Sequence, residues 1–146
     1  MRNKVTSAAE AVAIVQSGDA VCTSGFVGIG VPDALLVALE RRFLDTGEPR
    51  DLTLVFAAGQ GDGKERGLNA LGHEGLLGRA IGGHWGLIPK VGRLAMEGHI
   101  EAYNLPQGHI PHVSRHSCRQ TRYNFSSWAR NVCRPSSGRR KDQRAH

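Results

Sequence analysis

The feature that most constrains this chain is a glycine-rich loop placed between an apolar run and the start of a helix. In segment 23–43, "TSGFVGIGVPDALLVALERRF", Gly25, Gly28 and Gly30 follow a short β-prone run. Pro32 can then occupy the first helical position, where a missing N–H costs nothing. The apolar residues that follow recur at helical spacing: Leu35, Leu36, Leu39 and Phe43. A strand, a loop and a helix in this order are typical of α/β folds.

The same alternation of strands, glycines and helices recurs along residues 4–108. Ser7 and Glu10 form a capping-box pattern that predicts a helix ending at Gly18. A second short helix is expected between Pro89 and Gly98. Apolar runs predict strands within 20–24, 52–56, 78–89 and 100–108. We therefore expect an α/β fold with an open, mostly parallel sheet covered by helices.

Glycines at the carboxyl ends of strands have a functional and a structural interpretation. In open parallel sheets the ligand crevice lies beyond these ends, where glycine lets backbone N–H groups approach an anionic oxygen. The spacing alone is unspecific, because it is G-x-x-G-x-G rather than the dinucleotide order G-x-G-x-x-G, and no Ser or Thr follows Lys64 as a P-loop requires. Tight strand–helix turns without a ligand explain the spacing equally well.

Charge and glycine content change abruptly near residue 108. Through Gly108 there are 10 Lys and Arg against 12 Asp and Glu, a net charge of −2, whereas residues 109–146 hold 9 basic residues and one acidic residue, a net charge of +8. All but one of the 19 glycines precede His109. We therefore divide the chain into a domain at 4–108 and a basic tail at 109–146, whose composition predicts disorder.

Four blocks of the first part resemble the family I CoA-transferases, most closely the single-chain acetate/propionate (short-chain acyl) type. In order, they are "SGDAVCTSGFVGIGVPDAL", "RDLTLVFAAGQGDGKERGLN", "GGHWGLIPK" and "IEAYNLPQG". They match only the N-terminal part of such a protein, so the resemblance implies an incomplete domain. Sugar-phosphate isomerases and deaminases share this style of sheet, but they lack the combination of "SGFVGIGVP" with "AAGQGDG".

The resemblance implies an enzyme that moves coenzyme A between carboxylates, with coenzyme A as a substrate and no metal or redox cofactor. In the family, a glutamate attacks the acyl-CoA thioester and forms a glutamyl-CoA thioester, which a second carboxylate resolves. That glutamate belongs to the C-terminal half, and no residue of this chain matches its motif. Glu40, Glu65, Glu74 and Glu97 fall in surface or loop patterns. The resemblance thus implies no catalytic residue here and a truncated, inactive enzyme.

Substrate contacts are implied for the two glycine loops. Glycine-rich backbone at these strand ends shapes the acyl pocket in the family and helps to stabilise an oxyanion. The residues implied are Gly25, Phe26, Gly28, Gly30, Gln60 and Gly61. His84 and Trp85 either line the same crevice or pack at a strand end. The implied partners are an acyl-CoA, a short carboxylate and, in the intact family, further copies of the chain.

The basic tail departs from the family after "YNLPQG". If its codons are read one base later, with free choice at degenerate positions, they can spell a peptide beginning GVISHMFRDIAAGKPG, which resembles the family's continuation. The first base of each shifted codon is fixed by the middle base of the observed codon, so a sustained match is hard to obtain by accident. We therefore expect that the reading frame was lost at Gly108.

Two other interpretations of the tail carry less weight. Aromatic residues lie among arginines and "GRRKDQR" is strongly basic, so a nucleic-acid-binding tail on a small α/β domain is the alternative function. His109, His112 and His116 lie close together without Cys or carboxylate partners, which argues against a metal site.

The chain has three cysteines without a CxxC pair and no long apolar run. This composition predicts a cytoplasmic protein without disulfides or a membrane span.

Overall fold

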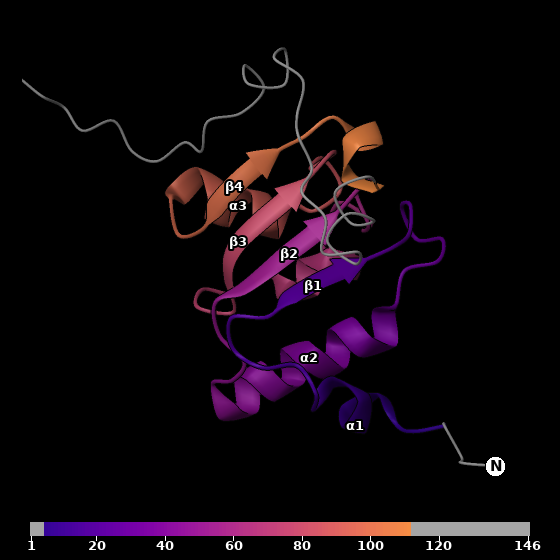
Figure 1. The fold of residues 1–146 in the computed structure, drawn as a ribbon, viewed down its shortest axis with the longest axis vertical. Helices are drawn as coiled ribbons and strands as arrows, with labels where there is room; N and C mark the ends of the chain where they lie inside the picture. The colour runs from indigo at the N-terminus through magenta and orange to yellow at the C-terminus, as the bar shows by residue number, and fades with distance from the viewer. Residues whose placement is uncertain (1–4, 112–146) are drawn as a thin grey trace, which may run out of the picture.

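A computed structural model describes residues 5–111 as one sheet with helices beside it (Figure 1). The strands are β1 (Ala20–Thr23), β2 (Leu52–Phe56), β3 (Leu77–Gly82) and β4 (Glu101–Asn104). The α-helices are α1 (Ala8–Val12), α2 (Asp33–Thr46) and α3 (Pro89–Glu97), and the 3-10 turns are η1 (Gly67–Leu71) and η2 (Gln107–His109). The strand order is β1-β2-β3-β4, and every neighbouring pair is parallel. The predicted fold class is confirmed.

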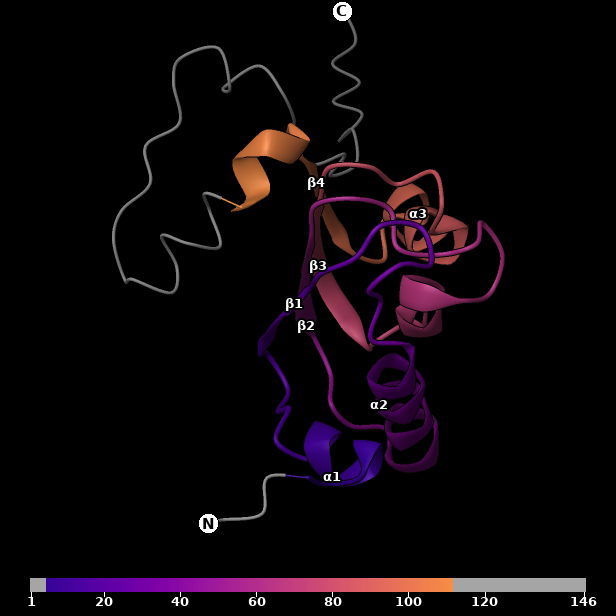
Figure 2. The ribbon, with the colours of Figure 1, turned by 90° about the vertical axis from the view of Figure 1, so that its right-hand side faces the viewer.

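One face of the sheet carries the main hydrophobic core. Along β2, Leu52, Leu54 and Phe56 are fully buried, whereas the alternating Thr53 and Val55 are only partly buried. Figure 2 shows α2, η1 and α3 on one side of the sheet, and their apolar residues join these strand residues in a single cluster. The core therefore fills the space between one sheet face and these helices. Among the described helices, none has the length and apolar character needed to cross a membrane.

Local sequence rules account for most helix boundaries. Ser7 and Glu10 form the predicted capping box, in which the Ser7 hydroxyl accepts from the Glu10 N–H at 3.3 Å and the Glu10 carboxylate accepts from the Ser7 N–H at 3.0 Å. Hydrogen bonds to the Glu10 carboxylate from the Thr6 hydroxyl, the Ser7 N–H and the Ser7 hydroxyl lower the pKa of Glu10 to about 2. Helix α3 begins at Pro89 and ends before Gly98, which has a left-handed conformation, as predicted.

Several predicted boundaries are wrong. Helix α1 stops at Val12 and does not reach Gly18, since the N–H of Gln16 turns onto Asp19 Oδ2 at 2.9 Å and that of Gly18 onto Arg50 O at 2.8 Å. Pro32 lies at the N-cap of α2 and not at the first helical position. The third and fourth strands end at Gly82 and Asn104, so the second halves of 78–89 and 100–108 are loops and turns.

The predicted tail falls almost entirely outside the described residues. Its first residues continue the chain through η2 and the buried Ile110. The proposed histidine, aromatic and arginine features from His112 onward lie beyond residue 111, so the structure does not bear on them.

Gly67 is expected to be indispensable to the fold for a reason that the neighbouring Gly63 does not share. Both glycines have a left-handed conformation, but a Cβ on Gly67 would lie 2.1 Å from Gln60 O, whereas a Cβ on Gly63 would meet nothing within 4 Å. Gly63→Ala should lower the free energy of unfolding by about 1–2 kcal/mol, from the backbone conformation alone. Gly67→Ala should lower it by about 1–3 kcal/mol more, from overpacking. Urea denaturation of both variants measures the difference, and equal losses would contradict this packing.

Candidate functional site

The carboxyl ends of all four strands lie at one edge of the sheet, because the strands are parallel. The chain leaves this edge in loops that begin at Ser24, Ala57, Gly83 and Leu105. Figure 1 shows these loops gathered at the arrowheads of the strands. We call them the rim. In open parallel sheets this edge is where ligands bind.

A hydrogen bond joins the two glycine loops of the rim directly. The N–H of Val27 donates to Gly59 O at 2.9 Å. Within the first loop, Phe26 and Ile29 exchange backbone hydrogen bonds of 3.0 and 2.9 Å, which close a tight turn. Val27 has a φ of 56° in this turn, a conformation that a β-branched residue rarely adopts. The loops that hold Gly28 and Gly61 thus lie at the same edge, as the sequence predicted.

The three glycines of the first loop differ in what surrounds them. Gly25 has a φ of 138°, and a Cβ there would lie 2.9 Å from Val31 Cγ2. Gly30 also has a left-handed conformation, whereas Gly28 does not and has nothing within 4 Å of a Cβ position. Gly25 and Gly30 therefore serve the turn itself. Gly28 is the glycine of this loop at which an added side chain would meet open space.

Apolar side chains of the first loop face solvent. Phe26 is 60% exposed, Ile29 is 78% exposed and Val27 is 39% exposed. None of the three belongs to the main core. The packing of the core therefore does not explain why they are exposed. This arrangement provides an apolar surface beside an open backbone, which suits an apolar part of a ligand.

Gln60 and Gly61 belong to the second rim loop but are buried within it. The Gln60 side chain is fully buried, and its Nε2 donates to Thr23 O at 3.1 Å, so it ties the second loop to the end of β1. Gly61 is packed so closely that a Cβ would lie 2.5 Å from Leu87 O. Of the six predicted substrate contacts, the structure therefore exposes Phe26, Gly28 and Gly30, partly exposes Gly25, and buries Gln60 and Gly61.

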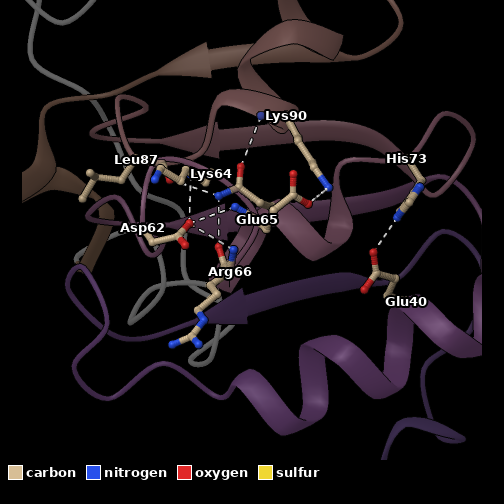
Figure 3. A network of polar contacts seen from close by, with 9 residues as sticks. Glu40, Asp62, Lys64, Glu65, Arg66, His73, Leu87 and Lys90 are labelled. Atoms are coloured by element: carbon tan, nitrogen blue, oxygen red, sulfur yellow. Dashed lines mark hydrogen bonds and ion pairs between the residues drawn. The ribbon is translucent and has the colours of Figure 1, made fainter.

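The second loop is held in shape by an acidic side chain. The Asp62 carboxylate accepts from the backbone N–H groups of Lys64 at 2.8 Å, Glu65 at 2.9 Å and Arg66 at 3.1 Å (Figure 3). The hydrogen bond from the Lys64 N–H has the largest effect and that from the Arg66 N–H the next largest, and together they hold the pKa of Asp62 below its ordinary value. Glu65 pairs with Lys90 at the start of α3. Asp62 is thus engaged in structure and is not poised to act as a base.

The third and fourth loops complete the rim. His84 is exposed, and its Nδ1 would lie 2.8 Å from a Cβ on Gly59, so its ring lies against the second loop. The Trp85 ring packs edge-on against Phe56, with 5.2 Å between ring centroids. Gln107 follows β4, is exposed, and has its Cα 3.0 Å from a Cβ position on Gly83. The sequence analysis did not single out Gln107, whose exposed side chain carries an amide N–H donor.

Of the glutamates, only Glu65 lies in a rim loop, and its carboxylate pairs with Lys90. All seven glutamates lie within residues 5–111, and each is engaged by another side chain. Glu40, for example, pairs with His73 at 2.7 Å (Figure 3), and Glu101 with Arg79 at 2.7 Å. The others are Glu10, Glu48, Glu65, Glu74 and Glu97. Within 5–111 no three His, Cys, Asp or Glu side chains gather as metal ligands would.

A groove between helices is separate from the rim. It has a volume of about 790 Å³ and lies between α1 and α2, where Ala9, Ala34 and Val37 are among the lining residues. None of the loops at the carboxyl ends of the strands contributes to it. The groove is therefore not part of the candidate site at the rim.

Comparison with known proteins connects this rim to a family. The model of the coenzyme A transferase family matches residues 5–116. Acetate CoA-transferase YdiF of Escherichia coli K12 is 38% identical over 116 residues, and caffeate CoA-transferase of Acetobacterium woodii is 33% identical over 112 residues. The crystal structure of the acyl-CoA transferase YdiF apoenzyme from Escherichia coli O157:H7 superposes with a TM-score of 0.76 at 35% identity.

The chain spans a small part of these relatives. The alignment with YdiF of strain K12 covers 78% of this chain and 22% of that enzyme, and the alignment with the caffeate enzyme covers 77% and 21%. The structural match covers 80% of this chain and 23% of the YdiF chain. A match to the alpha subunit of an Escherichia coli acetate CoA-transferase, at 32% identity, covers 46% of that subunit.

Proposed function

Because this chain belongs to the coenzyme A transferase family, we propose that its rim forms the N-terminal wall of a site where coenzyme A passes between carboxylates. The observation that carries this proposal is the hydrogen bond from Val27 to Gly59, which fixes the two glycine loops side by side at the carboxyl edge of the sheet. An open backbone at this edge suits a ligand with anionic oxygens. The spacing of the glycines in the sequence did not by itself distinguish a ligand-binding edge from tight strand–helix turns.

The proposed chemistry needs a nucleophile from outside this chain. A glutamate carboxylate attacks the thioester carbonyl of acyl-CoA and releases the coenzyme A thiolate, which returns to the anhydride to give a glutamyl-CoA thioester and the free acid. The second carboxylate then takes the coenzyme A by the reverse steps. Each addition places negative charge on a carbonyl oxygen, which N–H donors at the rim stabilise. We assign this role to the Gly28 N–H in the first loop, since those of Phe26, Val27 and Ile29 donate within the protein, and to the Gln107 amide.

The proposed substrates are an acyl-CoA and a carboxylate. Relatives of similar identity are named for acetate and for caffeate, so coenzyme A is common to them whereas the acyl group differs. A related crystal structure is described as a thioester complex with CoA. We place Phe26 and Gly28 against the acyl end of the thioester and treat Gln60 and Gly61 as the support beneath. A cytoplasmic enzyme that assembles from several copies is the setting we propose.

A chimaeric enzyme tests this function. Residues 5–108 of this chain would replace the matching segment of YdiF, and transfer from acetyl-CoA to propionate would be followed by chromatography of the CoA esters. We expect turnover, because the rim then faces a complete second half. A chimaera that folds, by circular dichroism and thermal unfolding, but does not turn over would contradict the proposal.

We also propose that residues 109–146 are read out of frame, although the family match extends to residue 116. The support is the codon pattern and the change in charge and glycine content near Gly108. Sequencing of the coding region is the test. A frame whose actual codons cannot spell the family's continuation would contradict it.

A further inference from the structure

Among the described residues, three side-chain polar atoms are buried without a hydrogen-bond partner, and all three lie at the carboxyl edge of the sheet. They are Thr23 Oγ1 at the end of β1, Gln60 Oε1 in the second rim loop and Trp85 Nε1 in the third. Buried polar groups are almost always hydrogen-bonded, because an unpaired one destabilises the fold. Exceptions of this kind gather at functional sites. Here they gather at the rim.

The Gln60 amide differs from the other fully buried amide of the described segment, that of Asn69. The Asn69 amide is used on both sides: its Nδ2 donates to Arg66 O at 3.0 Å and to Leu87 O at 3.1 Å, and its Oδ1 accepts from the Lys90 N–H at 3.2 Å. Within residues 5–111, the Gln60 side chain makes one hydrogen bond through its Nε2, and its Oε1 is unpaired. An apolar side chain of similar shape would not bury this oxygen. Stability alone therefore does not explain an amide at position 60.

The hydrogen bond of the Gln60 side chain holds the base of the first rim loop. Its acceptor, Thr23 O at 3.1 Å, belongs to the last residue of β1, immediately before that loop. The neighbouring Gly59 holds the same loop further along, since its O accepts from the Val27 N–H at 2.9 Å. Two consecutive residues of the second loop thus hold the first loop at two places. Gly28, whose N–H we assign to the developing oxyanion, directly follows the second place.

We propose that Gln60 is a positioning residue for transfer, whose amide fixes the first loop and with it the Gly28 N–H at the rim. The inference rests on the proposed function. Gln60 is placed to act through the loop and not by contact with the substrate, because its side chain is fully buried. A backbone N–H stabilises a developing negative charge best when it is held in place before the reaction. The Gln60 amide should therefore contribute to the rate of transfer more than to the binding of acyl-CoA.

Hydrogen exchange tests the positioning without an assay of turnover. In the 146-residue chain, Gln60→Met keeps the length of the side chain and removes the whole amide. Loss of the bond to Thr23 O is then offset by removal of the unpaired buried oxygen, so thermal unfolding should be nearly unchanged. Mass spectrometry should show that the backbone N–H groups of residues 24–29 exchange about tenfold faster, because the loop opens more easily. Exchange at the unsubstituted rate would overturn the proposal.

Two further results sharpen the exchange experiment. Thr23→Val removes the other unpaired oxygen at this junction and keeps the backbone O that Gln60 holds, so exchange of residues 24–29 should stay at the unsubstituted rate. Faster exchange in Thr23→Val, equal to that in Gln60→Met, would overturn the assignment to the Gln60 amide. A Gln60→Met chain that does not fold would show that the amide serves the fold, and would overturn the proposal as well.

Kinetics of the YdiF chimaera separate this inference from the proposed function. Gln60→Met should lower kcat for transfer from acetyl-CoA to propionate about tenfold and change KM for acetyl-CoA by less than about twofold, as loss of an interaction used in the transition state does. An unchanged kcat, or a change confined to KM, would overturn the inference and leave the proposed function standing. A folded chimaera that is inactive before any substitution would contradict the proposed function, and exchange of residues 24–29 would still decide whether Gln60 holds the loop.

Discussion

The 146-residue chain is expected to show no detectable transfer of coenzyme A when it is assayed alone. Its seven glutamates are all engaged in hydrogen bonds or ion pairs, including Glu65, the one that lies in a rim loop. The second half that would position substrates against the rim is missing from the match, which covers 22% of YdiF. Loss of positioning alone lowers rates by on the order of 10⁴-fold or more. Water could replace the nucleophile only by turning transfer into slow hydrolysis.

The measurement is transfer from acetyl- or propionyl-CoA to a second carboxylate, with intact YdiF at the same concentration as the positive control. Hydrolysis of the acyl-CoA thioester is followed in the same samples. Hydrolysis without transfer would show that water attacks the thioester in place of the missing nucleophile. Transfer by the 146-residue chain at a rate near that of YdiF would contradict the assignment of the nucleophile to the missing half.

Sequence patterns predicted the elements that short-range chemistry determines. The apolar run of β2, the capping box at Ser7 and the Pro89 start of α3 depend on a few neighbouring residues, and all three were predicted correctly. The parallel sheet followed from the alternation of strands and helices. The family resemblance, read from four blocks in order, is confirmed by the family match over residues 5–116.

What the sequence could not predict depends on contacts between distant segments. The 3-10 turn η1 is held to the connection between β3 and α3 by a hydrogen bond from Asn69 Nδ2 to Leu87 O at 3.1 Å. The burial of Gln60 follows from its bond to Thr23, 37 residues earlier. The positive φ of Val27 is fixed by its turn and its bond to Gly59, although local preference opposes it. Glycine spacing shows where the chain can bend, but it does not show which glycines face the crevice.

Gly28 distinguishes the proposed role in catalysis from a role in folding better than the other rim glycines do. Its φ lies outside the left-handed region, and a Cβ would meet nothing within 4 Å. Gly28→Leu should therefore leave the free energy of unfolding within about 0.5 kcal/mol of the unsubstituted protein, as surface changes usually do. The added side chain would occupy the space in which the thioester is proposed to lie. Gly25 is unsuitable for this test, because its conformation and its contact with Val31 would strain any replacement.

A matched control is available on α3. Gly92 also has nothing within 4 Å of a Cβ position, and it lies in a helix outside the rim. Gly92→Leu adds the same side chain, and in the chimaera we expect it to leave transfer nearly unchanged. Loss of activity in both variants would point to a general effect of the added leucine and not to the rim.

The most direct test of the account is kcat/KM for transfer from acetyl-CoA to propionate by the chimaera and its Gly28→Leu variant. We expect kcat/KM to fall by on the order of 10²-fold in Gly28→Leu, since displacement of a reacting group by about 1 Å has an effect of this size. Thermal unfolding should be unchanged and Gly92→Leu should retain activity. A folded Gly28→Leu chimaera with the kcat/KM of the unsubstituted chimaera would contradict the proposal that this rim holds the acyl-CoA.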